Sequence, residues 1–180
     1  MIEKNLPQWR QLLKSAQKKE GNPQQSKWIQ IATTNKAHNP RVRTVVFRGW
    51  IDDTSMLIFT DKRSDKVEDL KNNNNVEILW LFLKSRSQFR FKGKAEIVEE
   101  NSFYWNNLSN ESKKLWFWPD PGKMRNSEYF KNIIEPNISS NFLVLRINID
   151  ETELLKLSKP IHSRSVWKKD HNWECLELNP

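Results

Sequence analysis

The sequence predicts a mainly β fold, an antiparallel barrel with peripheral helices. First, about seven strand-like segments follow one another at short spacing, mostly through hairpin-length connections. Second, residues 88–98 alternate cleanly, with Phe89 and Phe91 on one face and Arg90 and Lys92 on the other. Third, the chain has only four glycines, without a dinucleotide fingerprint or a phosphate-binding loop. A Rossmann nicotinamide site is therefore excluded.

The first element is a helix over residues 7–20. Pro7 suits a first helical turn, and Gly21, followed by Asn-Pro, ends the helix. Apolar residues recur at helical spacing, which predicts one buried stripe. The stripe consists of Trp9, Leu12, Leu13 and Ala16.

Segments rich in β-branched and aromatic residues predict the strands. Asp52–Ser55 has the polar composition of a hairpin connection. The run of four asparagines from Asn72 to Asn75 predicts a tight turn that tolerates left-handed backbone. The strands are expected at residues 28–34, 42–50, 56–60, 76–83, 88–98 and 142–149, with a final hairpin of 161–168 and 173–178.

Two further helical segments are expected. Residues 64–72 predict a short helix with Ser64 as N-cap and with Val67 and Leu70 facing inward. Residues 99–132 predict a helical insertion that is interrupted by the aromatic and Pro/Gly segment 116–122. Its inward residues are expected to be Phe103, Tyr104, Leu108 and Leu115. We expect one domain over residues 1–180, with the N-terminal helix within residues 1–22.

Composition excludes several classes of function. The net charge of +8 comes from basic residues interleaved with 22 acids, so a nucleic-acid partner is not expected. The single Cys175 and the three scattered histidines provide neither a disulfide nor a metal site. The N-terminal residues lack the apolar stretch of a signal peptide, and no segment approaches the roughly 18 apolar residues of a membrane span. We expect a cytoplasmic protein without a membrane partner.

The hairpin and turn of residues 40–66 predict an anion site. Arg43, Arg63, Ser64 and Lys66 offer cations, a hydroxyl and helix-start N–H groups to one anion. Arg43 lies within an apolar strand, where a charged group is costly to bury unless it is paired. A bound anion would supply that partner. The alternative is an edge strand whose arginines, Arg41 and Arg43, are in solvent and paired with aspartates.

Separated motifs then indicate a family. They are PRVRTVVFRGW, LIFTDKRSDKVEDL, SQFRFKGKAEIV and a closing HSR with a following Trp, in this order. Together they resemble the pyridoxamine 5′-phosphate oxidase family. The RSDK loop and the LWFWP segment resemble its cyanobacterial and plant branch of FMN-binding split-barrel proteins. The resemblance implies a homodimeric split barrel with FMN at the subunit interface.

By position, the resemblance also implies cofactor contacts. The FMN phosphate would be bound by Arg43 and Lys66, with help from Ser64 and Arg63. The strand backbone would line the isoalloxazine, and Gln88 would come from the partner chain. The remaining residues are Thr44, Val45 and Val46 along the ring, Phe59 and Thr60 at the ribityl-phosphate end, and Arg164 near the ring.

The substrate side departs from the family pattern. Arg48, Tyr104 and Ser112 fall at substrate-binding positions, and His162 remains as the catalytic histidine. Substrate-phosphate arginines are missing, because Leu108 and Pro160 stand where the family has them. A flavin-stacking Trp is likewise replaced by Leu155, with Trp167 as a candidate substitute.

The implied function is an FMN-dependent oxidoreductase that moves a hydride from a small substrate to FMN and then to oxygen or another acceptor. Its substrate stays open because of the missing arginines. The alternative is a non-catalytic flavin-binding or ligand-sensing protein.

Overall fold

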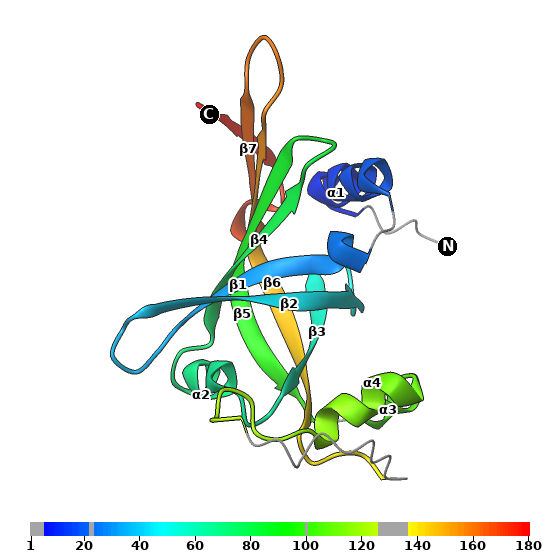
Figure 1. Ribbon diagram of the computed structural model, residues 1–180. Coiled ribbons are helices and arrows are strands. Elements are labelled where there is room, and N and C mark those ends of the chain that lie inside the picture. Colours follow the sequence, from blue (N-terminus) through cyan, green and yellow to red (C-terminus); the bar gives the residue numbers. More distant parts are fainter. Residues whose placement is uncertain (1–5, 22–23, 100, 126–136) are drawn as a thin grey trace.

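The computed structural model describes residues 6–21, 24–99, 101–125 and 137–180. Its strands form one antiparallel sheet in the order β3-β2-β1-β4-β5-β6-β7-β8, and the pairing of β3 with β6 closes the first six into a barrel (Figure 1). This confirms the predicted fold class. The strands are β1 Trp28–Thr34, β2 Pro40–Trp50, β3 Ser55–Asp61, β4 Asn75–Phe82, β5 Ser87–Val98, β6 Phe142–Lys156, β7 Ser163–Lys168 and β8 Cys175–Leu178.

Strand β6 organises the molecule because it is a partner of three strands. Its first half pairs with β3 and with the end of β5, and its second half pairs with the start of β5 and with β7. The sequence pattern predicted that this strand ends at Ile149, because the polar residues 150–153 interrupt the apolar alternation. Thr152 and Glu153 are nevertheless buried. Opposite the bulge at Asp150 in β6, a Cβ on Gly93 would lie 2.0 Å from the carbonyl oxygen of Asn148, so only glycine allows this approach.

Helices cover the outside of the barrel (Figure 1). In α1 the buried residues are Trp9, Leu13 and Ala16, as the apolar stripe predicted, whereas Leu12 of that stripe is 37% exposed. In the described residues no helix is long and apolar enough to cross a membrane. The helices are α1 Gln8–Glu20, α2 Asp65–Asn72, α3 Ser102–Asn106 and α4 Asn110–Lys114, with 3₁₀ turns at η1 Gln24–Lys27, η2 Leu115–Phe117 and η3 Lys169–His171.

Large aromatic residues fill the core. The main cluster joins α1 to the barrel, where Trp9 lies edge-on to Phe91 at a centroid distance of 5.7 Å. A second cluster lies under α3 and contains Leu57, Trp105, Phe142 and Val144. The rings in these two clusters serve packing, and each large aromatic can bury roughly 150–250 Å².

Two further local predictions were wrong in part. The asparagine run contains no left-handed residue: Asn73 is extended at φ −146°, and its side chain accepts a hydrogen bond from the Asn75 amide at 3.1 Å. That Asx contact turns the chain without positive φ. In the helical insertion, Phe103 and Leu115 are 71% and 45% exposed, and Trp105 is the buried residue. The helices there are one turn long, so no stripe continues between them. The predicted insertion beyond residue 125 lies outside the described residues.

Candidate functional site

The two strands of the predicted anion site diverge. Pairing between β2 and β3 runs from Trp50 opposite Met56 to Phe47 opposite Ile58. Beyond that point, residues 43–46 pair with β1 alone and residues 59–61 pair with β6 alone, among the strands that the structure describes. One edge of β2 therefore keeps backbone N–H and C=O groups available to a ligand. These are the residues predicted to line a flavin ring.

Lys66, a predicted phosphate ligand, lies close to this divergence. Its Nζ donates to Thr60 Oγ1 at 2.7 Å and to Ser64 Oγ at 3.0 Å. Burial, and then the nearby charge of Arg43, lower the pKa of Lys66 from its ordinary value. None of the ion pairs found among the described residues includes it. A partly desolvated cation that donates to hydroxyls beside a second cation is a donor set suited to an oxyanion, although the charges of Asp61 and Asp65 oppose the shift in its pKa.

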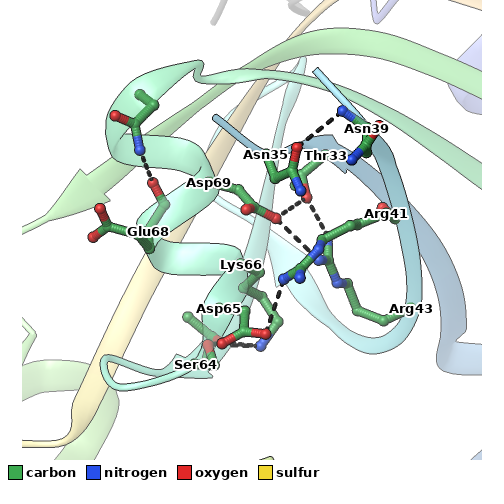
Figure 2. A network of polar contacts seen from close by, with 12 residues as sticks. Thr33, Asn35, Asn39, Arg41, Arg43, Ser64, Asp65, Lys66, Glu68 and Asp69 are labelled. Carbon is green, nitrogen blue, oxygen red and sulfur yellow. Dashed lines mark hydrogen bonds and ion pairs between the residues drawn. The ribbon is translucent and has the colours of Figure 1, made fainter. Parts of the chain in front are cut away.

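Arg43 completes the cationic group and rests on buried partners (Figure 2). Its Nη2 donates to Asp69 Oδ2 at 3.1 Å, and its Nη1 donates to Thr33 Oγ1 and to the carbonyl of Arg41. Beside it, Arg41 pairs with Asp65 at 2.8 Å. Both arginines thus have the aspartate partners that the edge-strand alternative required. Only the Arg41 pair is in solvent, because the side chains of Arg43 and Asp69 are 22% and 5% exposed.

Arg63 makes other contacts. It donates to Asp61 through Nε and Nη2, to Asp120 through Nη1 at 2.6 Å, and to the carbonyl of Trp118. The hydrogen bonds to Asp61 are the main reason why the pKa of Arg63 is raised. In the described residues, Arg63 therefore ties the 116–122 segment to the turn before α2. Its predicted contact with a phosphate stays a prediction.

Arg48 and Tyr104, two of the predicted substrate residues, meet through Phe59. The Arg48 guanidinium lies 5.3 Å from the centroid of the Phe59 ring, and the Phe59 and Tyr104 rings are 5.9 Å apart. Burial lowers the pKa of Arg48. Arg48 also borders a cavity of about 670 Å³ whose other walls include Trp116 and Trp118. This arrangement places a cation and aromatic faces beside the end of the β2–β3 pairing.

Ser112, the third predicted substrate residue, is engaged locally. Its backbone amide donates to Ser109 Oγ at 3.2 Å, and its hydroxyl accepts from the same Oγ at 3.0 Å, where Ser109 caps α4. This is a capping arrangement at the start of a short helix. The substrate role of Ser112 stays a prediction.

Gln88 and Arg164 belong to a second group. Both lie opposite Leu155, so the three side chains form a row across β5, β6 and β7. Glu153 accepts a hydrogen bond from Arg164 at 2.8 Å and another from Arg90. Figure 1 shows β7 and α2 at opposite ends of the barrel, so one chain does not bring this row to the Lys66 end.

The remaining predictions concern His162 and Trp167. His162 is exposed in the loop before β7, and its Nδ1 lies 3.0 Å from the carbonyl oxygen of Ser158. Its catalytic role stays a prediction. Trp167 is 1% exposed and donates to Gln8, and it lies on the sheet face opposite Arg164. Since it is part of the core, it does not substitute for a flavin-stacking Trp at Leu155.

The sequence interpretation missed Thr33 and Asp69, which support Arg43. Thr33 continues the buried alternation of Ile29 and Ile31 in β1, and Asp69 lies between the inward Val67 and Leu70 of α2. A polar residue at a buried position of a regular pattern is a usable signal, because it needs a hydrogen-bonded partner.

Comparisons with known proteins identify the family to which this chain is similar. Residues 6–99 match the family model described as pyridoxamine 5′-phosphate oxidase, FMN-binding domain. The chain is 30% identical to pyridoxine/pyridoxamine 5′-phosphate oxidase 2 of Arabidopsis thaliana over 193 residues, with 96% of each chain covered.

Solved structures agree. The crystal structure of a pyridoxamine 5′-phosphate oxidase-related, FMN-binding protein from Nostoc punctiforme superposes with a TM-score of 0.86 at 27% identity, over 96% of this chain and 98% of that one. PhzG from Burkholderia lata has the same fold, with a TM-score of 0.82 at 19% identity over 96% and 90%. The chain therefore belongs to the pyridoxamine 5′-phosphate oxidase family and carries its FMN-binding domain.

Proposed function

We propose that this protein is a homodimeric FMN-dependent oxidoreductase whose flavin site is divided between two copies of the chain. The observation that carries the proposal is Lys66, a partly buried cation whose hydrogen-bond partners among the described residues are hydroxyls, next to Arg43 at the divergence of β2 and β3. That arrangement suits the terminal phosphate of FMN, because cations and hydroxyls bind such a group through charge-assisted hydrogen bonds.

The rest of the cofactor fits along β2. With the phosphate at Lys66, Thr60 and Phe59 would hold the ribityl chain, and the edge of residues 44–46 that does not pair with β3 would hold the ring. Backbone N–H and C=O groups there can meet the polar edge of the isoalloxazine. When bound, FMN supplies the two-electron acceptor, and the chain supplies binding, orientation and exclusion of water.

An exposed apolar face supports the homodimer. Leu81, Gln88, Leu155, Arg164 and Leu178 are successive register partners, with Leu81 and Leu178 50% and 47% exposed. Exposed leucines at both ends of a row that contains predicted flavin contacts fit a surface that another protein covers. A second copy of the chain, in a twofold arrangement, would cover it and bring Gln88 and Arg164 to the partner's Lys66 end.

The substrate would lie against Arg48, Phe59 and Tyr104, over the flavin ring. The curated relative is named for oxidation of pyridoxine and pyridoxamine phosphates. Each missing arginine, at Leu108 and Pro160, would remove about 1.5–3 kcal/mol of charge-assisted phosphate binding. We therefore expect pyridoxamine phosphate to be a weak substrate, and a small molecule with less negative charge to be the better one.

The test of cofactor binding is a spectrum followed by a titration. Purified protein is expected to be yellow, with flavin absorbance corresponding to about one FMN per chain, as a site at a twofold interface requires. Protein freed of flavin should bind added FMN with quenching of its fluorescence. Colourless protein that does not bind FMN in the titration would refute the proposal.

The missing substrate arginines favour a second candidate, a flavin-binding or ligand-sensing protein without turnover. Anaerobic mixing of the flavin-loaded protein with pyridoxamine phosphate, pyridoxine phosphate or NAD(P)H separates the two. Rapid bleaching of the flavin absorbance by any of them supports the oxidoreductase. A flavin that stays oxidised with all of them favours passive binding.

The lowered pKa of Lys66 gives FMN binding an alkaline limit. Burial, and then the charge of Arg43, lower this pKa, while Asp61 and Asp65 oppose the shift. Only the protonated Nζ attracts the phosphate, so FMN affinity should fall as pH rises through a pKa below 10.5. The unfolded chain keeps that proton to higher pH, so the same group makes the free protein more stable as pH rises across this interval.

The measurement is the dissociation constant of riboflavin divided by that of FMN, followed from neutral pH to about 10.5. Because both ligands carry the same flavin ring, this ratio cancels the titration of the ring itself. The ratio should fall in the wild type and stay level in Lys66→Arg, whose charge persists over this range. An unchanged wild-type ratio, or an equal fall in Lys66→Arg, would contradict the assignment.

A further inference from the structure

A buried carboxylate lies beneath the cationic end of the site. Asp69 is 4% exposed and Thr33 is 2% exposed. Thr33 Oγ1 donates to Asp69 Oδ2 at 2.7 Å, and Arg43 donates to both residues, so the three side chains form a closed triangle (Figure 2). They come from β1, β2 and α2, and the triangle therefore links three elements at the point where β2 leaves β3.

Electrostatics alone would not place a carboxylate there. A negative charge next to Arg43 opposes the binding of a phosphate and offsets part of the attraction of the cation. The arrangement needs another physical reason, since a buried ion pair is by itself weak evidence for stability.

That reason is the direction of the guanidinium. A guanidinium donates through Nε and through both Nη atoms in a fixed planar fork. Nη1 of Arg43 is engaged by Thr33 and by the Arg41 carbonyl, and one hydrogen of Nη2 by Asp69. The plane of the group is thereby fixed, and within the described part of the chain Nε and the second hydrogen of Nη2 are left for a ligand. A flexible arginine would instead lose rotamer freedom when the ligand binds.

We propose that Asp69 and Thr33 are positioning residues that hold the Arg43 guanidinium in place and so set the preference of this protein for FMN over riboflavin. This inference rests on the proposed function, because it needs the FMN phosphate at Arg43 and Lys66. Neither residue would touch the flavin. Their effect would reach the cofactor through Arg43 alone, and it would concern only the part of FMN that riboflavin lacks.

Two expectations of opposite sign make the proposal testable. If Asp69 acted only through its charge, Asp69→Asn would add net positive charge and tighten FMN binding. If it positions Arg43, the same variant weakens FMN binding, because the guanidinium loses a charged partner that defines its plane. We expect the positioning effect to prevail, with a loss of about tenfold in FMN affinity.

The experiment measures dissociation constants of FMN and riboflavin for the full chain, by fluorescence quenching, in the wild type, Asp69→Asn and Thr33→Val. Glu68→Gln is the matched control, since Glu68 precedes Asp69 on α2 but forms an exposed pair with Lys36 at 2.9 Å. Both test variants should lose about tenfold in affinity for FMN and keep their affinity for riboflavin. The control should keep both affinities. Thermal melts verify that each variant folds. If Asp69→Asn does not fold, the FMN affinity of Thr33→Val tests the positioning role.

A double-mutant cycle adds a readout that a merely structural role would not change. In an Arg43→Met background, Asp69→Asn should have no further effect on FMN affinity, because the group that it positions is gone. Equal losses for FMN and riboflavin, additive effects in the cycle, or tighter FMN binding by Asp69→Asn would each overturn the inference. A wild type that binds FMN no better than riboflavin would overturn the phosphate assignment itself, and the inference with it.

Discussion

Lys66→Met is expected to lose about tenfold to a hundredfold in FMN affinity and to keep its affinity for riboflavin. Lys66 is desolvated, its Nζ is directed at Thr60 and Ser64, and the proposed phosphate position lies between these hydroxyls and Arg43. A hydrogen bond to a charged group contributes about 1.5–3 kcal/mol, which corresponds to this range of affinity. Fluorescence titration with each flavin measures it.

The control for this variant is Lys71→Met. Lys71 lies at the other end of the same helix and is exposed, so it changes the net charge equally without changing the site. FMN affinity should stay within about twofold of the wild type, as expected for a screened surface charge. If Lys71→Met weakened FMN as much as Lys66→Met, net charge and not local contact would be the cause.

Mixing two defective variants is expected to restore flavin binding. The cationic group of Arg43 and Lys66 and the row of Gln88 and Arg164 lie at opposite ends of one chain. A flavin site divided between two copies therefore takes the cationic group from one copy and the row from the other. Lys66→Met lacks the first group, and the double variant Gln88→Ala with Arg164→Ala lacks the second. A dimer of one of each has one site with both defects and one site with neither.

The measurement is flavin content after the two chains are unfolded together and refolded with FMN. About a quarter of wild-type tight sites should return, since half of randomly assorted dimers are mixed and each has one intact site. Each variant refolded alone should show none of these sites, and Lys71→Met mixed with the wild type should show all of them. A mixture no better than the separate variants would contradict the divided site.

Much of the fold could be predicted because it follows from local patterns. Alternation in residues 88–98 placed Phe89 and Phe91 in the core, and helical spacing placed Trp9 and Leu13 there. The end of β6 escaped prediction because burial of Thr152 and Glu153 depends on β5 and β7, which are distant in sequence. In the insertion, helices of one turn give too few residues for a period to identify the inward face.

The cationic residues of the site were also visible in the sequence, but their partners were not. A charged residue in an apolar strand signalled that Arg43 needs a counter-charge. The partner, Asp69, lies 26 residues away on α2, and Thr33 joins from β1. Arg63 shows the same limit, since Asp120, which is 57 residues away, engages it. Helix and strand periods describe neighbours in the chain, and these contacts connect elements that only the closed barrel brings together.

By itself the sequence determined the antiparallel β class, the motif order that marks the family, and the cationic pair Arg43 and Lys66. Those properties depend on residue type and on spacing along one element. The tertiary structure decided that β2 and β3 diverge beside this pair, that the buried Asp69 carboxylate pairs with Arg43, and that Gln88 and Arg164 lie at the far end. These contacts join strands and a helix that are distant in the chain, and only the folded sheet brings them together.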